Sequence, residues 1–194
     1  MVAAMGLAFH NKNTGTAFDD SVDGWIRKGS PRLMNDLVHL ADPPLVAVLF
    51  TIVIAVACMR RRWDVAVLAF VSPVAATLLV EEVLKPWIHR TQSDPYVVHA
   101  FGYEPLAFPS GHETGIGSLV AVLGLLVITS RWSKARRAYV LTAILLVDAI
   151  AAIGLVGRYY HYITDTVGAF LVCVAVTLTA ALLIDAAMPR RASA

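Results

Sequence analysis

The run AYVLTAILLVDAIAAIGLV, residues 138–156, is apolar over nearly its whole length and contains a single charged residue, Asp148. The run TVGAFLVCVAVTLTAALLI, residues 166–184, contains none. Each run is close to the roughly 20 apolar residues that a helix needs to cross a bilayer. Of the 194 residues, 58% are apolar and 15% are charged, whereas an average soluble domain has about 45–50% and about 25%. The sequence therefore predicts a membrane protein.

Three further apolar stretches occur, at residues 45–59, 65–80 and 115–129. They are shorter than a full span, but each is flanked by residues that the end of a membrane helix tolerates, and these residues lengthen it. We therefore expect an all-α fold, a polytopic membrane helix bundle of about five transmembrane helices. The chain 1–194 forms a single domain in this interpretation, with the bundle at residues 43–188 and a cytoplasmic tail at residues 189–194.

The segment before the first span, residues 1–42, shows helical periodicity without a spanning length. Apolar residues recur at helical spacing at positions 18, 22, 25 and 26, and again at positions 33, 34, 37 and 38 after a Ser-Pro helix start. We expect short amphipathic helices here, which either lie on the outer membrane surface or pack on the bundle. No cleavable signal peptide is predicted, because residues 1–10 lack a basic start and a long apolar core.

The charge pattern predicts the orientation. The formal net charge is +2, from 16 basic and 14 acidic residues, and this balance predicts no nucleic-acid partner. Basic residues gather in the segments that share one side of a five-span bundle, at positions 60–62, 131–137 and 190–191. By the positive-inside rule, this side is cytoplasmic. We therefore expect a plasma-membrane protein with a cytoplasmic C-terminus and an extracytoplasmic site, on the side that holds all six histidines.

Three polar clusters fall at the outer ends of the predicted spans, at residues 85–90 (KPWIHR), 108–112 (FPSGH) and 158–165 (RYYHYITD). Ser110 and Gly111 directly precede a helix, where unpaired amides bind anions, although an isolated Ser-Gly pair is more often a plain N-cap. His161 and Asp165 are four residues apart, so a helix would place the carboxylate beside the imidazole and leave one ring nitrogen free.

Cations complete this set of residues. Lys85, Arg90 and Arg158 supply positive charge, and the planar guanidinium suits phosphate oxygens. Basic side chains at helix ends also extend to the lipid interface, and Lys85 has a helical partner in Glu81 four residues earlier. Two histidines with cations and an anion-binding turn favour covalent phosphoryl transfer with a separate general acid. Neither a metal site nor another cofactor is predicted, because no Cys/His spacing or paired-carboxylate cage occurs.

The ordered set of motifs resembles the type 2 phosphatidic acid phosphatase family, membrane relatives of the vanadium haloperoxidases. PSGH at residues 109–112 matches the middle motif of that family, and His161 with Asp165 matches the end of its third motif. Gln92 and Leu155 occupy the positions where the family has arginines. We therefore assign those roles to the neighbouring Arg90 and Arg158 as substitutions.

The resemblance implies that His161 becomes phosphorylated, that Asp165 orients it, and that His112 protonates the leaving oxygen. In this scheme the phosphate is bound by Lys85, Arg90, Ser110, Gly111 and Arg158, without a metal. The partners are membrane lipids and a lipid phosphate or diphosphate. Polyprenyl diphosphate, such as the undecaprenyl diphosphate of a bacterial cell envelope, is the first expectation, and phosphatidic acid or phosphatidylglycerol phosphate comes next.

Several alternatives stay open at this stage. A phosphotransferase of the same fold would share the covalent step, and a catalytically weakened member would only bind lipid phosphate. For Asp148 in the predicted fourth span, a structural role is favoured slightly over a proton path. The oligomeric state does not follow from the sequence.

Overall fold

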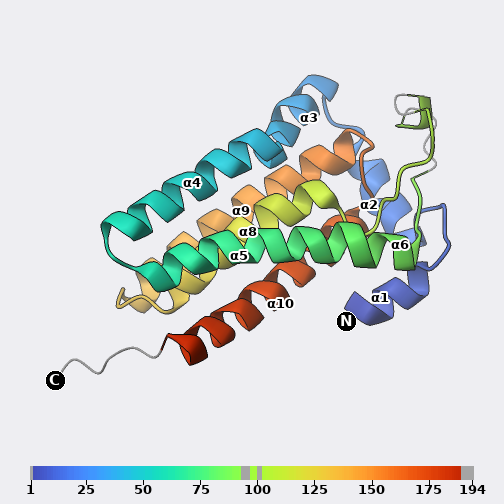
Figure 1. Ribbon diagram of the computed structural model, residues 1–194. Coiled ribbons are helices and arrows are strands. Elements are labelled where there is room, and N and C mark those ends of the chain that lie inside the picture. The colour runs from blue at the N-terminus through green and yellow to red at the C-terminus, as the bar shows by residue number, and fades with distance from the viewer. Residues whose placement is uncertain (1, 93–96, 100–101, 189–194) are drawn as a thin grey trace.

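The computed structural model describes residues 2–92, 97–99 and 102–188. The regular structure in these residues is helical, apart from an isolated β-bridge between Thr91 and Leu106. Figure 1 shows long helices that lie side by side, with the connections at the two ends of the bundle. The predicted all-α fold is confirmed for this part of the chain.

Three short helices precede the bundle: α1 (Val2–Phe9), α2 (Ala17–Ile26) and α3 (Pro31–Val38), the last followed by a 3-10 turn at His39–Ala41. The long helices are α4 (Pro43–Met59), α5 (Trp63–Leu78), α8 (Gly111–Ile128), α9 (Lys134–Gly157) and α10 (Ile163–Ala187). A π-helical segment, Leu79–Leu84, joins α5 directly to the short helix α6 (Lys85–Ile88).

Five helical segments of the described chain are long and apolar enough to cross a membrane, judged by length and composition. They are Pro31–Met59, Trp63–Ile88, Gly111–Ile128, Lys134–Gly157 and Ile163–Ala187. Each contains all or nearly all of one of the five predicted apolar stretches and extends beyond it on at least one side. The expected number of spans is therefore confirmed, and the chain is a multi-pass membrane protein.

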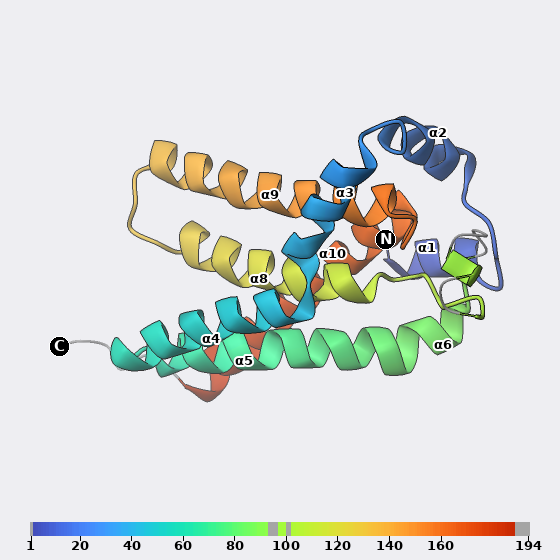
Figure 2. The same cartoon turned by 90° about the horizontal axis from the view of Figure 1, so that it is seen from above.

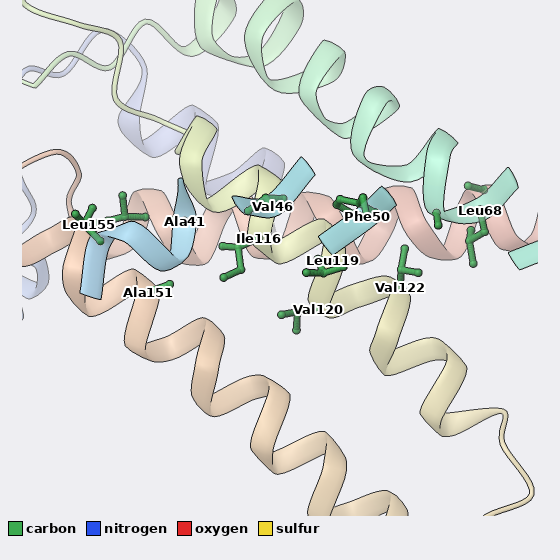
Figure 3. Packing of buried hydrophobic residues seen from close by; sticks show 13 residues of the cluster. Ala41, Val46, Phe50, Leu68, Ile116, Leu119, Val120, Val122, Ala151 and Leu155 are labelled. Atoms are coloured by element: carbon green, nitrogen blue, oxygen red, sulfur yellow. The ribbon is translucent and has the colours of Figure 1, made fainter. Parts of the chain in front are cut away.

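Helix α8 lies at the centre of the bundle. Its 18-residue apolar window is 56% buried, whereas the windows of the other four segments are 22–33% buried. Figure 3 shows its side chains Ile116, Leu119 and Val122 in contact with the core residues that α4, α5 and α9 supply. The outward faces of the other long helices remain apolar, for example at Phe70 and Leu182, which are exposed as lipid-facing residues would be.

The amphipathic helices α2 and α3 pack on the bundle, which is one of the two predicted arrangements. Helix α3 lies across α9 because Gly154 lacks a side chain: a Cβ there would be 2.5 Å from the backbone nitrogen of Val38. Met34 and Val38 are buried in this contact. The opposite faces keep exposed apolar residues, among them Trp25 and Leu33. Such residues suit the interface between lipid and water.

The carboxyl group of Asp148 on α9 contacts the carboxyl group of Glu113 on α8 through a side-chain hydrogen bond. The sequence did not indicate which residue contacts Asp148, and its neighbour is a second acid from the adjacent helix. Both side chains are buried, Glu113 to 1% and Asp148 to 8% exposure. This contact joins two neighbouring spans, which favours the structural role expected for Asp148.

The connections divide between the two ends of the bundle, as both views show (Figures 1 and 2). The α4–α5 and α8–α9 connections, which carry the basic clusters at 60–62 and 131–137, lie together at one end. Helices α1, α2 and α6 lie at the other end. The predicted basic pair at 190–191 and the predicted tail at 189–194 lie outside the described residues. Helix α1 was not predicted as a helix, because its apolar residues show no amphipathic periodicity.

Candidate active site

A cavity of about 600 Å³ opens at the end of the bundle opposite the basic connections, where the three polar clusters converge. The residues with polar or aromatic groups that line it are Glu81, Lys85, Gly111, His112, Tyr160 and His161. They come from the end of the α5–α6 segment, the start of α8 and the loop between α9 and α10. The fold thus brings together residues that are up to 80 positions apart in the sequence.

The two histidines of the motifs face each other across this cavity. The ring centroids of His112 and His161 are 6.3 Å apart, at an interplanar angle of 62°. The ring of Tyr160 stacks on His112 at 6.0 Å and 25°, which holds the imidazole at the mouth of α8. From the sequence, an interfacial position is the default for Tyr160 and a place in the site is the alternative; Tyr160 lines the cavity.

His161 is oriented by a backbone carbonyl rather than by a helical carboxylate. Its Nδ1 donates a hydrogen bond to the oxygen of Ala107 at 3.0 Å, whereas Nδ1 lies 3.7 Å from Oδ2 of Asp165. A carbonyl oxygen only accepts, so Nδ1 carries the proton and the Nε2 lone pair is free. The carboxylate of Asp165 lies beside the imidazole, as the spacing of four residues predicts, although His161 itself precedes Tyr162, the N-cap of α10, and lies outside the helix.

Asp165 begins helix α10 and ties it to α8. Its Oδ2 accepts a hydrogen bond from the backbone nitrogen of Tyr162 at 2.9 Å, and its own carbonyl accepts one from the backbone nitrogen of Ser110 at 3.1 Å. Its side chain is fully buried. Asp165 therefore fixes the segment that carries His161 and joins it to the PSGH turn, while its charge lies near the His161 ring.

Arg90 lies behind the cavity and does not line it, which corrects its assignment as a phosphate ligand. Its guanidinium is completely buried and pairs with Oδ1 of Asp165 at 2.6 Å and with Oδ2 of Asp19 at 2.8 Å. The rings of Phe9 and Tyr162 lie over the guanidinium at 4.4 and 4.5 Å. Two carboxylates and two aromatic rings hold this guanidinium outside the cavity, and Asp165 is its contact with the segment that carries His161.

Two buried acids of α2 complete this network, and sequence reasoning missed both. The carboxylate of Asp19 accepts hydrogen bonds from the backbone nitrogen and hydroxyl of Thr164, both at 3.0 Å. Burial raises the pKa of Asp19, but hydrogen bonds from the Thr16 backbone and from Arg90 outweigh this effect and lower it below the usual value. Burial raises the pKa of Asp23 to about 7 against the opposing charge of Arg27. The signal in the sequence that could have indicated Asp19 is the capping box that it forms with Thr16 at the start of α2.

The other predicted phosphate ligands occupy different places. Lys85 lines the cavity, but its Nζ is 2.7 and 2.9 Å from the two carboxylate oxygens of Glu81. Ser110 is fully buried, and its hydroxyl accepts from the backbone nitrogen of Glu113 at 3.2 Å as an N-cap. Arg158 is half-buried at the C-cap of α9 and is not among the residues that line the cavity.

The two positions where the resembling family has arginines are closed to a phosphate. Gln92 is fully buried, and its side-chain nitrogen donates to the carbonyl oxygen of Tyr159 at 3.2 Å. Leu155 is part of the apolar core. Among the described residues, no three or more His, Cys, Asp and Glu side chains are grouped as a metal site would require. Lys85, the amide end of α8 and the histidines are therefore the groups available to an anion.

Comparison with known proteins agrees with this architecture. No family model and no curated protein sequence matches the chain. A solved structure does match, the crystal structure of a transmembrane PAP2-type phosphatidylglycerolphosphate phosphatase from Bacillus subtilis, with a TM-score of 0.72 and 21% sequence identity. The match covers 98% of this chain and 95% of that chain. The chain therefore has the fold of this PAP2-type membrane phosphatase over nearly its whole length.

Proposed function

We propose that this protein is a metal-independent phosphatase of the type 2 phosphatidic acid phosphatase family, which hydrolyses a lipid phosphate or diphosphate through a phosphohistidine on His161. The observation that carries the proposal is the pair of histidines across one cavity, with a free Nε2 on His161 and the fold of a PAP2-type phosphatase around it. Lys85 and the first amides of α8 supply positive potential in the same cavity.

In this mechanism the Nε2 lone pair of His161 attacks phosphorus while the bond from phosphorus to the leaving oxygen breaks. His112, protonated, gives its proton to that oxygen. Water then attacks phosphorus and gives a proton to the neutral His112, while the bond from phosphorus to Nε2 breaks. Phosphate is released, the His161 ring is neutral again and His112 is protonated again. The hydrogen bond from Nδ1 to the Ala107 carbonyl and the nearby Asp165 charge stabilise the positive charge that the His161 ring carries while Nε2 is bonded to phosphorus.

A second cavity supports a lipid substrate. It has a volume of about 460 Å³ and shares Pro43, Gly111 and His112 with the first. Most of its other lining residues belong to α4 and α5 and are apolar, such as the core residue Phe50 and the exposed Phe70. A hydrocarbon chain in this groove would remain in the bilayer while its phosphate reaches the histidines.

We further propose that the substrate is a polyprenyl diphosphate, with phosphatidic acid and phosphatidylglycerol phosphate as the next candidates. The solved structure with the same fold is described as a phosphatidylglycerolphosphate phosphatase, which supports testing that lipid alongside the others. The active site would face the extracytoplasmic side of the plasma membrane, because the basic connections lie at the opposite end of the bundle.

Phosphate release by the detergent-purified protein, with excess chelator, tests the proposal. The panel contains polyprenyl diphosphate, phosphatidic acid and phosphatidylglycerol phosphate. His161→Ala should abolish release, and His39→Ala, at an exposed histidine outside the cavity, should leave it unchanged. His112→Ala should slow monophosphate hydrolysis by about 10²–10⁴-fold. It should slow diphosphate hydrolysis less, because a phosphate leaving group needs less protonation.

Full activity in His161→Ala would overturn the covalent mechanism, and complete loss with the chelator would overturn metal independence. Product analysis with an added acceptor alcohol separates hydrolysis from transfer to an alcohol.

A further inference from the structure

A carboxylate occupies the part of the cavity that a phosphate would need. Glu81 lines the cavity, and its two oxygens lie 2.7 and 2.9 Å from the ammonium of Lys85. Lys85 is the cation among the residues that line this cavity. Its charge is therefore already neutralised by a group of the protein itself.

The same carboxylate lies against the first residue of α8. A Cβ added to Gly111 would be 2.5 Å from Oε1 of Glu81 and 3.4 Å from Nζ of Lys85. The backbone amides at this helix start and the positive end of its dipole favour an anion at this place. The carboxylate of Glu81 therefore lies against both groups that a bound phosphate would use, the ammonium of Lys85 and the N-terminus of α8.

Glu81 reaches this place and its neighbour Glu82 does not. Both belong to the π-helical segment Leu79–Leu84, and adjacent residues of a helix point in different directions. Glu81 is half-buried in the cavity, while Glu82 is exposed. Two adjacent glutamates of equal charge therefore have different surroundings, and Glu82 serves as a matched control.

We propose that Glu81 determines substrate specificity. In the empty site its carboxylate occupies the position of the substrate phosphate, so that only a phosphate with two or more negative charges displaces it from Lys85. This inference rests on the proposed phosphatase function. A terminal phosphate or diphosphate carries more charge than the single one of a phosphodiester, and gains more from Lys85 and the α8 amides. The internal carboxylate would thus exclude the diester phospholipids that fill the bilayer around the site.

The test compares Glu81→Gln with Glu82→Gln and the unmodified protein in detergent. Two quantities are measured: the dissociation constant of inorganic phosphate, by calorimetry, and the inhibition constant of phosphatidylglycerol, a diester, against hydrolysis of a lipid monophosphate. Glu81→Gln should tighten phosphate binding about tenfold, which corresponds to about 1.4 kcal/mol. It should lower the inhibition constant of phosphatidylglycerol by at least as much. Glu82→Gln should change neither.

Weaker phosphate binding in Glu81→Gln would overturn the proposal, because Glu81 would then hold Lys85 in position for the substrate. Unchanged phosphate binding in Glu81→Gln would overturn the proposal as well, since the carboxylate would then not compete with phosphate for Lys85. Should Glu81→Gln fail to fold, Glu81→Asp, which draws the carboxylate back from Lys85, should shift binding in the same direction. Phosphate binding needs no turnover, so a shift in this constant without hydrolysis of any lipid would contradict the phosphatase function alone.

Discussion

The buried network around Arg90 gives the sharpest test of the site, because the structure assigns this residue a role different from the one that the sequence indicates. Arg90 pairs with Asp19 and Asp165, and all three side chains are fully buried. Arg90→Met would leave two carboxylates without a cation, which costs about 3–5 kcal/mol in comparable buried pairs. For a chain of this size, the melting temperature should fall by roughly 10 °C.

Asp19→Asn should cost less, because Arg90 keeps Asp165 as a partner and only one charge-assisted contact, worth about 1.5–3 kcal/mol, is lost. The double variant removes one of the two carboxylates that Arg90→Met leaves uncompensated. The double variant should therefore be no less stable than Arg90→Met alone. The coupling free energy between positions 19 and 90 should be about 1.5–3 kcal/mol.

Thermal unfolding of the four proteins in one detergent measures this cycle, and phosphate release measures the effect on the site. Additive changes in stability would refute the network. An Arg90→Met protein with an unchanged melting temperature and a higher KM would show instead that Arg90 binds the phosphate, as the sequence pattern indicated.

Three further predictions concern stability, each measured as a melting temperature in detergent. The pKa of Asp23 is raised to about 7 from its usual 3.8. Between these two pH values the folded state keeps a proton that the unfolded chain loses, so the stabilisation by the protonated Asp23 falls as the pH rises from about 4 to about 7. Asp23→Asn should therefore raise the melting temperature at pH 8 and not at pH 4, and an equal gain at both would contradict the shift. Gly154→Ala should lower the free energy of unfolding by about 1–3 kcal/mol, because the added methyl would lie 2.5 Å from the Val38 backbone. Gly124→Ala is the control: its nearest contact is at 3.8 Å, so it should be neutral or slightly stabilising. Ser110→Ala should cost about 1 kcal/mol as a lost N-cap, and a higher KM at an unchanged melting temperature would instead make Ser110 a phosphate ligand.

The membrane bundle followed from the sequence because the bilayer imposes a length and a composition on every spanning helix. Apolar runs such as residues 138–156 carry that signal without any knowledge of their neighbours. The short-range motifs were equally accessible: PSGH placed His112 at a helix start, and the motif order predicted that His112 and His161 belong to one site. The first of these features depends on adjacent residues, and the second on the order of the motifs along the predicted spans.

The roles of the charged residues could not be predicted in the same way, because they depend on partners that are distant in the sequence. Asp19 reaches Arg90 across 71 positions, and Ala107 accepts from His161 across 54. A one-dimensional pattern shows that a cation or a carboxylate is present, but it does not show which other group neutralises it. Arg90 was therefore assigned to the phosphate, although a carboxylate from α2 and one from α10 hold it away from the cavity.

Glu81 shows the same division within a single helical segment. The sequence predicted that Glu81 pairs with Lys85, because the two residues are four positions apart on a helix. Only the tertiary structure decided that this pair faces the N-terminus of α8 inside the cavity, since that position depends on how α8 packs against the segment Leu79–Leu84. Local spacing determined the contact between the two side chains, and the packing of the bundle determined where that contact lies.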